Sequence, residues 1–304
     1  MYLIITAAAI IIFTAASFLI LRINLAGAEA EDLSDPGKLA GTRLEKYARQ
    51  LSSDARVFSA HPSEDLWADS PDGTRLHSSL MKGTGDNIVI LAHGYRSSAL
   101  NDFCGIGQWY LGHGFSILMP DQRAHGMSSG KYITFGVKER YDMLEWIRYA
   151  RSICEGEIWL HGVSMGAASL LMVLPLTGDI RISGIVADST FDNVIELLIY
   201  QMKRRYHVPP FLGSLLLAPA GRIMIGKEAK RLSPSECLRE SGVRALVIHG
   251  GRDATVPPGM QQRFAGAGAV TALFPEARHA LCWAEDPKTY ASLMEEWMFG
   301  QKDI

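Results

Sequence analysis

The sequence predicts a doubly wound α/β domain, in which a mostly parallel sheet carries helices on both faces. From about residue 55, short apolar runs alternate with segments of helical spacing, as in consecutive βαβ units. The chain has 304 residues, of which 48% are hydrophobic and 20% are charged, as in folded globular proteins. This length allows one large domain or two small ones. A disordered or fibrous chain is excluded.

A hairpin comes before the alternation. Residues 64–69 and 74–81 flank Ser70-Pro71-Asp72-Gly73, whose Pro and Asp-Gly pair suit a tight turn between antiparallel strands. Six further strands, which look buried on both faces, are predicted at residues 88–92, 115–119, 158–160, 182–187, 245–248 and 270–274. Helices are predicted between them at residues 98–112, 137–151, 165–174, 258–264 and 287–298.

One interval breaks the alternation. Residues 191–231 contain no strand, so we predict an insertion between two sheet strands. It lies past the carboxyl edge of the sheet, where ligands bind in such folds, and this position predicts a helical lid. A packed pair of helices without a moving part is the alternative.

The amino-terminal segment is strongly apolar. Residues 2–21 carry no charge, and at 1.5 Å per residue they are long enough to cross a hydrocarbon core of roughly 30 Å. We predict a transmembrane anchor over residues 1–21. A cleaved signal peptide is the alternative, because Ala26-Gly27-Ala28 offers a small-x-small cleavage pattern. Against it, no Lys or Arg precedes the apolar run, and the run exceeds the roughly 7 to 15 residues of a signal-peptide core.

The sequence does not decide on which side of the membrane the main domain lies. The nearby positive charges are the α-amino group on one side and Arg22, then Lys38, on the other. Counting them leans weakly toward a cytoplasmic main domain, whereas an exported, tethered domain would lie outside. Residues 22–53 are expected to form a linker and a lead-in helix, with a breaker at residues 35–37 and the helix over 38–51. Residues 54–304 form the main domain in this interpretation.

Charge and cysteine content exclude several partners. Thirty Lys and Arg face thirty-two Asp and Glu without a basic block, so no nucleic acid is expected as a partner. The four cysteines are far apart, with no spacing suited to zinc, and we expect buried free thiols at Cys104, Cys154, Cys237 and Cys282. No metal, organic cofactor or obligate protein partner is implied.

The run Gly162-Val163-Ser164-Met165-Gly166 follows a predicted strand directly and precedes an apolar helix. This context is typical of a serine held on a strained strand-to-helix turn, where the two glycines leave room that side chains would fill. We predict that Ser164 is a nucleophile. A glycine-rich turn that serves only close helix packing is the alternative.

A serine hydroxyl needs a base, and the base needs a partner that fixes its tautomer. Asp253 follows the strand ending in Ile248, and His279 lies 26 residues farther on, past the last strand. All three residues therefore sit at carboxyl ends of strands, which meet at one sheet edge. Asp188 also follows a strand and is the alternative acid.

The expected chemistry also requires hydrogen-bond donors for an oxyanion. Acyl transfer puts negative charge on the former carbonyl oxygen, so backbone N–H groups should point there. We predict donors at Met165, next to the nucleophile, and at Tyr95, in the loop after strand 88–92. Turn-stabilising hydrogen bonds are the expected role of the histidines that precede Gly at strand ends, His93, His161 and His249.

Seven motifs together resemble the α/β-hydrolase superfamily: HGY, DQRAHGMSSG, GVSMGAAS, DSTFDN, SPSECL, HGGRDATVP and RHA. They look closest to membrane-anchored bacterial serine hydrolases akin to the Bem46 and ABHD13 group. The resemblance spans about residues 66–297 and implies an eight-stranded sheet, a triad of Ser164, Asp253 and His279, and oxyanion donors at Tyr95 and Met165. Two departures stand out: Ala124 replaces a glycine common in relatives, and the HGGG form of the oxyanion loop is absent.

We therefore expect hydrolysis of an ester or thioester bond of a small or lipid-like acyl substrate, through an acyl-serine intermediate. A peptidase or an acyltransferase would use the same residues, and a membrane-tethered binding protein without catalysis is a third interpretation. In the insertion, Lys203-Arg204-Arg205 beside an apolar face could lie on a lipid surface, or could simply be a solvated helix face.

Overall fold

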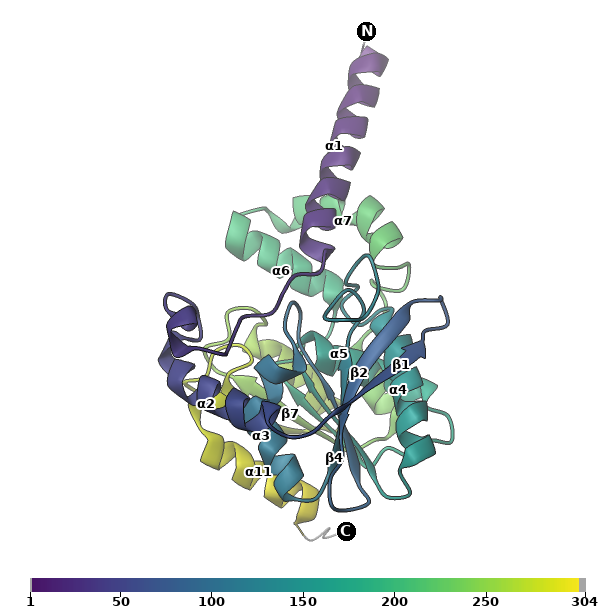
Figure 1. Cartoon of the computed structure of the whole chain (residues 1–304). Helices are drawn as coiled ribbons and strands as arrows, with labels where there is room; N and C mark the ends of the chain where they lie inside the picture. The colour runs from purple at the N-terminus through teal and green to yellow at the C-terminus, as the bar shows by residue number, and fades with distance from the viewer. Residues whose placement is uncertain (1, 301–304) are drawn as a thin grey trace.

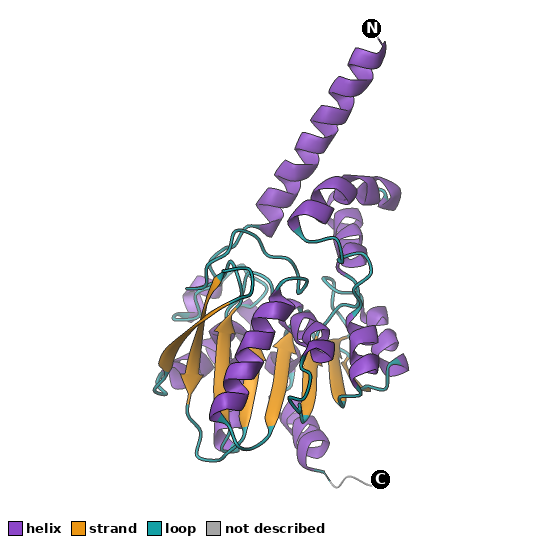
Figure 2. Ribbon diagram, turned by 90° about the vertical axis from the view of Figure 1, so that its right-hand side faces the viewer, coloured by secondary structure: helices purple, strands orange, loops and turns teal. Residues whose placement is uncertain are grey.

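The computed structural model describes the backbone of residues 2–300, and the side chains within it except those of residues 2–12 and 219. The core is a twisted sheet with helices on both faces, and two further helices and the N-terminal helix stand above one end of it (Figures 1 and 2). The eight strands are ordered β1-β2-β4-β3-β5-β6-β7-β8. Their bounds are Glu64–Asp69, Arg75–Met81, Ile88–Ala92, Ser116–Asp121, Ile158–Val163, Gly184–Asp188, Ala245–Gly250 and Val270–Phe274 for β1 to β8.

The sheet is mostly parallel, as predicted. Strand β2 pairs antiparallel with β1 and with β4, and all other neighbours are parallel. The predicted turn closes the β1–β2 hairpin, with Gly73 at φ +79° and its N–H donating to the Ser70 carbonyl at 2.8 Å. Because β3 and β5 to β8 run in one direction, the loops after them gather at one edge, which is the upper edge in Figure 1.

How deeply each strand is buried depends on its position in the sheet. Strands β3, β5, β6 and β7 are buried along their whole length, as their apolar runs predict. The same expectation is wrong for β8, where Val270 is 52% and Leu273 is 53% exposed. This strand lies at one edge of the sheet, where the structure pairs it with β7 on one side, so fewer neighbours cover it.

Helices cover the two faces in separate hydrophobic clusters. The helices are α3 (Ala99–Gly112), α4 (Glu139–Ile153), α5 (Met165–Val173), α8 (Pro234–Ser241), α9 (Gln261–Gly266), α10 (Cys282–Glu285) and α11 (Pro287–Phe299). Helix α8 was not expected, although its ends carry ordinary signals: Ser233 caps it, Pro234 opens it and Gly242 ends it at φ +64°. The four cysteines are free and buried, as expected.

The lead-in helix lies farther along the chain than predicted. Residues 38–51 are not one helix: two 3₁₀ turns, Pro36–Leu39 and Glu45–Tyr47, precede α2 at Ala48–Ser59. Gly41 at φ +74° interrupts the expected helix. The side chains of Leu51, Ala55 and Phe58 then recur on one face of α2 and are buried, and α2 packs on α3.

Three helices stand above the carboxyl edge of the sheet: α1 (Tyr2–Leu25), α6 (Val194–Tyr206) and α7 (Pro210–Met224) (Figure 1). The last two fall within the insertion predicted at residues 191–231. Over the part of the chain whose side chains are described, no helix combines the length and apolarity needed to cross a membrane. The anchor predicted at residues 1–21 lies for its larger part outside that range.

Candidate active site

Ser164 sits on a sharp elbow between β5 and α5. Its φ of +53° and ψ of −113° are strained for a residue with a side chain, and its N–H donates to the Asp188 carbonyl at 2.8 Å. The two glycines of the motif are needed for space. A Cβ on Gly162 would lie 2.4 Å from Ala167 Cα, and one on Gly166 would lie 1.9 Å from the Ala92 carbonyl oxygen. The turn is therefore possible only with glycine at both places.

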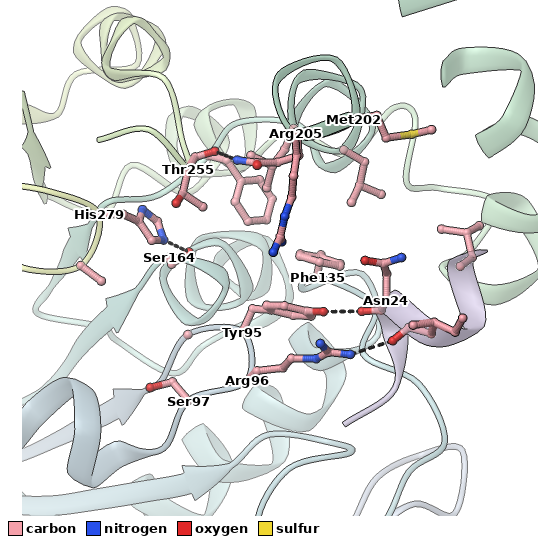
Figure 3. Close-up of a pocket in the computed structure, with 18 of the residues that line it drawn as sticks. Asn24, Tyr95, Arg96, Ser97, Phe135, Ser164, Met202, Arg205, Thr255 and His279 are labelled. Carbon is pink, nitrogen blue, oxygen red and sulfur yellow. Dashed lines mark hydrogen bonds between the residues drawn. The ribbon is translucent and has the colours of Figure 1, made fainter. Parts of the chain in front are cut away.

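The three residues predicted for the chemistry lie in one chain of hydrogen bonds. His279 Nε2 is 2.9 Å from Ser164 Oγ (Figure 3), and His279 Nδ1 is 2.7 Å from Asp253 Oδ2. Each residue follows a strand of the parallel sheet, so the carboxyl ends bring them together. With the proton on Nδ1 held by the aspartate, Nε2 can accept the serine proton.

Asp253 is fixed on both oxygens. Its Oδ1 accepts the N–H groups of Thr255 at 2.7 Å and Val256 at 2.8 Å. Burial alone would raise the pKa of this carboxyl, but hydrogen bonds from His249 and His279 outweigh burial and hold the pKa well below its usual range. Asp253 is therefore ionised at neutral pH.

His249 is a neighbour that sequence analysis assigned only to a turn. It does contact its own turn, with Nε2 3.1 Å from the Val256 carbonyl, but the same nitrogen is 3.3 Å from Asp253 Oδ2. Its Nδ1 has no partner among the described side chains and backbone groups. Burial lowers the pKa of His249, but the contact with Asp253 outweighs burial and raises that pKa above its ordinary value. The four-residue spacing to Asp253, directly after a buried strand, was the available signal.

Asp188, the alternative acid, contacts residues other than His279. Its side chain accepts the Ser189 hydroxyl at 2.8 Å, while its backbone carbonyl holds the N–H of Ser164. Burial raises the pKa of Asp188, and the Ser189 hydrogen bond opposes this only in part. Both ring nitrogens of His279 are already taken by Ser164 and Asp253. Asp188 therefore supports the elbow and does not contact the imidazole.

The two predicted oxyanion donors lie beside Ser164. Met165 is the first residue of α5, and Tyr95 follows Gly94, where a Cβ would lie 3.5 Å from Ser164 Cβ. Across residues 2–300, neither the Tyr95 nor the Met165 amide donates to another protein group outside the regular elements. The Tyr95 ring stacks on Phe135 at a centroid distance of 5.1 Å and packs against the hydrophobic cluster that includes Phe191 and Leu197 of the insertion.

Side chains that sequence analysis missed hold the Tyr95 loop. Asp102 accepts the Gly94 N–H and the Ser97 hydroxyl, each at 2.7 Å. His125 Nε2 accepts the Arg96 N–H at 3.0 Å. Asp102 carries no motif, and His125 lies in the DQRAHGMSSG motif without any expected role there. Only the folded arrangement shows that both residues contact the Tyr95 loop.

A cavity of about 840 Å³ opens above Ser164 and His279 (Figure 3). Its walls are largely apolar and come from α1, α6, α7 and the loops at the sheet edge, with Leu21, Phe135, Phe191, Leu197, Leu198, Met202, Leu216 and Leu217 among them. Within residues described by the structure, no three His, Cys, Asp or Glu side chains cluster as metal ligands would. The arrangement suits covalent chemistry on an apolar substrate.

Solved structures share this fold. A Pyrococcus furiosus esterase, Pf2001, aligns with a TM-score of 0.64 at 23% identity, covering 80% of this chain and 94% of that one. Est1E from Butyrivibrio proteoclasticus, solved with ferulic acid, aligns with a TM-score of 0.61 at 18% identity over 78% and 98% of the two chains. An esterase from Exiguobacterium antarcticum, EaEST, aligns with a TM-score of 0.58 at 18% identity over 77% and 99%.

Sequence comparison agrees with the fold. The uncharacterized protein YqkD of Bacillus subtilis is 25% identical over 226 residues, which are 71% of this chain and 72% of YqkD. Residues 89–293, which include Ser164, Asp253 and His279, match the description "Alpha/beta hydrolase family". The chain therefore belongs to the alpha/beta hydrolase family.

Proposed function

We propose that this protein hydrolyses an ester or thioester bond of a small or lipid-like acyl substrate through an acyl-serine intermediate. The observation that carries the proposal is the hydrogen-bonded chain Ser164–His279–Asp253 at the foot of a largely apolar cavity. Membership of the alpha/beta hydrolase family and the esterases among the structural neighbours support it.

In this mechanism His279 takes the proton of Ser164 as the hydroxyl attacks the substrate carbonyl. The same proton then passes to the leaving alcohol or thiol, and His279 next activates the water that releases the acyl group. Asp253 stays ionised and fixes the imidazole with its Nδ1–H toward the carboxylate. The low pKa of Asp253 suits this role, because the imidazolium formed during the reaction needs a charged partner.

The oxyanion of the tetrahedral intermediate would lie between the N–H groups of Tyr95 and Met165. Each such donor lowers the barrier by roughly 2.7 to 4 kcal/mol in comparable sites. The Met165 amide is also at the N-terminus of α5, where the helix dipole favours negative charge.

The test is labelling with a fluorophosphonate probe, which reacts with activated serines. The wild-type chain should be labelled and should hydrolyse p-nitrophenyl butyrate, and Ser164→Ala should lose both activities. Ser152→Ala, an exposed serine on α4, is the matched control and should behave as wild type. Labelling that persists in Ser164→Ala would show that the nucleophile is elsewhere. A wild-type chain that neither reacts nor turns over any acyl substrate would favour a binding protein.

A second measurement separates the reaction classes that share these residues. The rates with p-nitrophenyl esters, aminoacyl amides and ester plus an alcohol acceptor are compared in the same buffer. Ester hydrolysis should dominate. Faster amide turnover would indicate a peptidase, and acyl transfer to the alcohol in preference to water would indicate a transferase.

We further propose that the N-terminal helix is a membrane anchor and that the protein groups with the Bem46 and ABHD13-like hydrolases. The support is the uncharged run at residues 2–21 and the motifs named above. Such an anchor would hold the insertion near the bilayer, because Ser17 and Leu21 of α1 are buried against the rest of the molecule and Ser17 contacts α7.

After expression in the cell, the full chain should stay with membranes in alkaline carbonate. Release into the supernatant would contradict the anchor, and protease protection in intact vesicles would identify the side.

A further inference from the structure

The carboxyl-terminal end of α1 forms part of the cavity over Ser164. Five of its residues line the cavity: Ser17, Ile20, Leu21, Ile23 and Asn24. The helix end is firmly seated, since Leu21 and Leu25 are buried in a hydrophobic cluster with Phe135 and Val137. The Leu25 carbonyl also accepts the Ile133 N–H at 2.7 Å. This wall precedes the part of the chain that matches the family.

The same helix end contacts the loop that carries the proposed oxyanion donor. Arg96 Nη2 donates to the Ile23 carbonyl at 2.7 Å and to the Ala26 carbonyl at 3.1 Å, and Arg96 Nε donates to the Ala26 carbonyl at 3.2 Å. The Tyr95 hydroxyl donates to the Asn24 carbonyl (Figure 3). Two consecutive residues of the loop are thus tied to the end of α1 by their side chains.

These contacts stabilise both the end of α1 and the backbone of Arg96. The last carbonyls of a helix lack intrahelical partners and lie at the negative end of its dipole, so a guanidinium suits them. Arg96 itself has φ +53°, a left-handed conformation that costs a residue with a side chain roughly 1 to 2 kcal/mol. Such a conformation persists only where the surroundings hold it. Here the holding contacts are α1 on the side chain and His125 on the amide.

We propose that the carboxyl-terminal end of α1 is a positioning element of the active site: by holding Tyr95 and Arg96 it keeps the Tyr95 amide aimed at the oxyanion. The inference rests on the proposed hydrolase function. It also bears on the fate of the N-terminus, because cleavage at the small residues 26–28 would remove the carbonyls that Arg96 binds. The active chain is therefore the one that retains α1.

The first test removes the guanidinium from the full chain. Arg96→Gln should lower kcat for p-nitrophenyl butyrate about 10- to 100-fold, less than the 10²- to 10³-fold loss of a whole oxyanion donor, with KM changed less than about threefold. Arg96→Lys should recover part of kcat, because an ammonium can still reach a carbonyl. Arg22→Gln, an exposed arginine on the same helix, is the matched control and should match wild type. A kcat within twofold of wild type in Arg96→Gln would overturn the proposal.

The second test asks whether the effect runs through α1. Leu25→Ala loosens the seat of the helix end without touching the loop, and it should also lower kcat. In a double-mutant cycle, Leu25→Ala with Arg96→Gln should be little worse than the worse single variant, because both break the same contact. Effects that multiply would show that Arg96 acts independently of α1 and would contradict the proposal. An inactive wild-type chain would instead contradict the proposed function.

A separate observation concerns charge in the cavity. Among its cationic lining residues, Arg96 is bound to α1 and Arg43 donates to the His279 carbonyl at 3.0 Å. Arg205 also lines the cavity, and its guanidinium carbon lies 5.9 Å from the centre of the Tyr206 ring. Among the described residues, no hydrogen bond or ion pair is formed by the guanidinium of Arg205. Its side chain runs from α6 into the cavity on the side of Tyr95 and Phe135 (Figure 3). Its neighbours Lys203 and Arg204 do not line the cavity.

We infer that Arg205 binds an anionic group, a carboxylate or a phosphate ester, on the acyl substrate of the proposed reaction. A guanidinium suits both groups because it offers paired donors. Carboxylate recognition is tested with mono-p-nitrophenyl adipate against its methyl ester. Phosphate recognition is tested with a lysophosphatidic acid against the uncharged monoacylglycerol of the same chain.

In Arg205→Gln, kcat/KM for one of the anionic substrates should fall about 5- to 10-fold relative to its uncharged partner, since the charge-assisted contact is partly exposed. Arg204→Gln is the matched control and should leave both ratios unchanged. The adipate arm and the phosphate arm identify which anion is bound. Equal ratios in wild type and Arg205→Gln for both pairs would overturn the inference, while normal turnover of the uncharged esters would leave the proposed function intact.

Discussion

The cavity has a floor and a roof that are built in different ways. The floor consists of Ser164, Asp253 and His279 with their loops at the carboxyl edge of the sheet. The roof consists of the carboxyl-terminal end of α1 with α6 and α7. In the floor, Ser164 and Asp253 are buried and each is held by backbone hydrogen bonds. In the roof, large apolar side chains face outward, with Phe211 75% and Ile223 71% exposed.

Under the proposed function, this difference separates the residues that act in the reaction from those that contact the substrate. The floor depends on backbone conformations that few residues can adopt, so most substitutions there should affect kcat or folding. The roof depends on side-chain packing, which tolerates substitution better, so changes there should affect KM more than kcat. The end of α1 is the exception, because it contacts both the cavity and the Tyr95 loop.

The largest effect is expected from the acid of the floor. Asp253→Asn should lower kcat for p-nitrophenyl butyrate by about 10⁴-fold, because the amide favours the wrong tautomer of His279. Asp179→Asn, at an exposed position, is the control and should have no effect. A loss below tenfold would assign the acid to another carboxylate, with Asp188 the first to examine.

The second effect tests the elbow. Gly166→Ala should destabilise the fold by about 3 kcal/mol, since its Cβ would overlap the Ala92 carbonyl oxygen, and activity should be lost with it. Gly259→Ala, where a Cβ meets no atom within 4 Å, should change the free energy of unfolding by less than about 0.5 kcal/mol. Urea unfolding measures both. Equal stability of the two variants would mean that the elbow can relax.

The third effect is a pH dependence of stability. The folded pKa of Asp253 is lowered from its ordinary 3.8, so its stabilisation is fully present above that value and is lost as pH falls through the lowered pKa. The free energy of unfolding of wild type should therefore fall more steeply below pH ~4 than that of Asp253→Asn, by on the order of 2 kcal/mol in all. Parallel curves in acid urea titrations would show that the contacts of Asp253 add no net stability.

The fourth effect belongs to the roof. Leu217→Ala removes a buried apolar wall of the cavity and should raise KM for an octanoyl ester about fivefold, a loss near 1 kcal/mol of apolar contact, with kcat within twofold. Leu215→Ala, on the same helix but outward-facing, is the matched control and should leave KM unchanged. A drop in kcat without a change in KM would place Leu217 with the floor.

The smallest effect is stabilising. Ala124 has φ +61°, so Ala124→Gly should relieve strain and raise the free energy of unfolding by about 0.5 to 1 kcal/mol. Thermal unfolding at one pH measures the change. A loss of stability would show that the Ala124 methyl, which packs near Gly27, contributes more than the strain costs.

Much of the fold could be predicted because it is encoded locally. Buried parallel strands are continuous apolar runs, and the hairpin turn carries its own Pro and Asp-Gly residues. The exposure of β8 could not be predicted from its sequence, because the residues of a strand do not determine whether it lies at the edge of the sheet. The lead-in helix was misplaced because Gly41 takes a left-handed conformation that breaks the expected helix, and α2 begins only at Ala48.

The candidate site also contains residues that could be predicted and residues that could not. Ser164, Asp253 and His279 could be nominated because each follows a strand, and the structure brings them into contact. Their roles and those of the Tyr95 and Met165 amides remain proposals. His249, Asp102 and the end of α1 were missed. His249 was assigned only to a turn although it lies in a motif, and Asp102 and α1 reach the site through contacts between segments that are distant in the sequence. The lid role of residues 191–231 also stays a prediction.

The seating of α1 has a consequence for how the protein is made. The Tyr95 hydroxyl bonds to a carbonyl 71 positions earlier in the chain, and Ser17 bonds to a carbonyl of α7 that lies 199 positions later. Helix α1 therefore leaves the ribosome long before its partner α7 has been made, and its apolar side is uncovered in the meantime. A chaperone or a bilayer that shields this helix during translation would protect the nascent enzyme until the cavity can close around it.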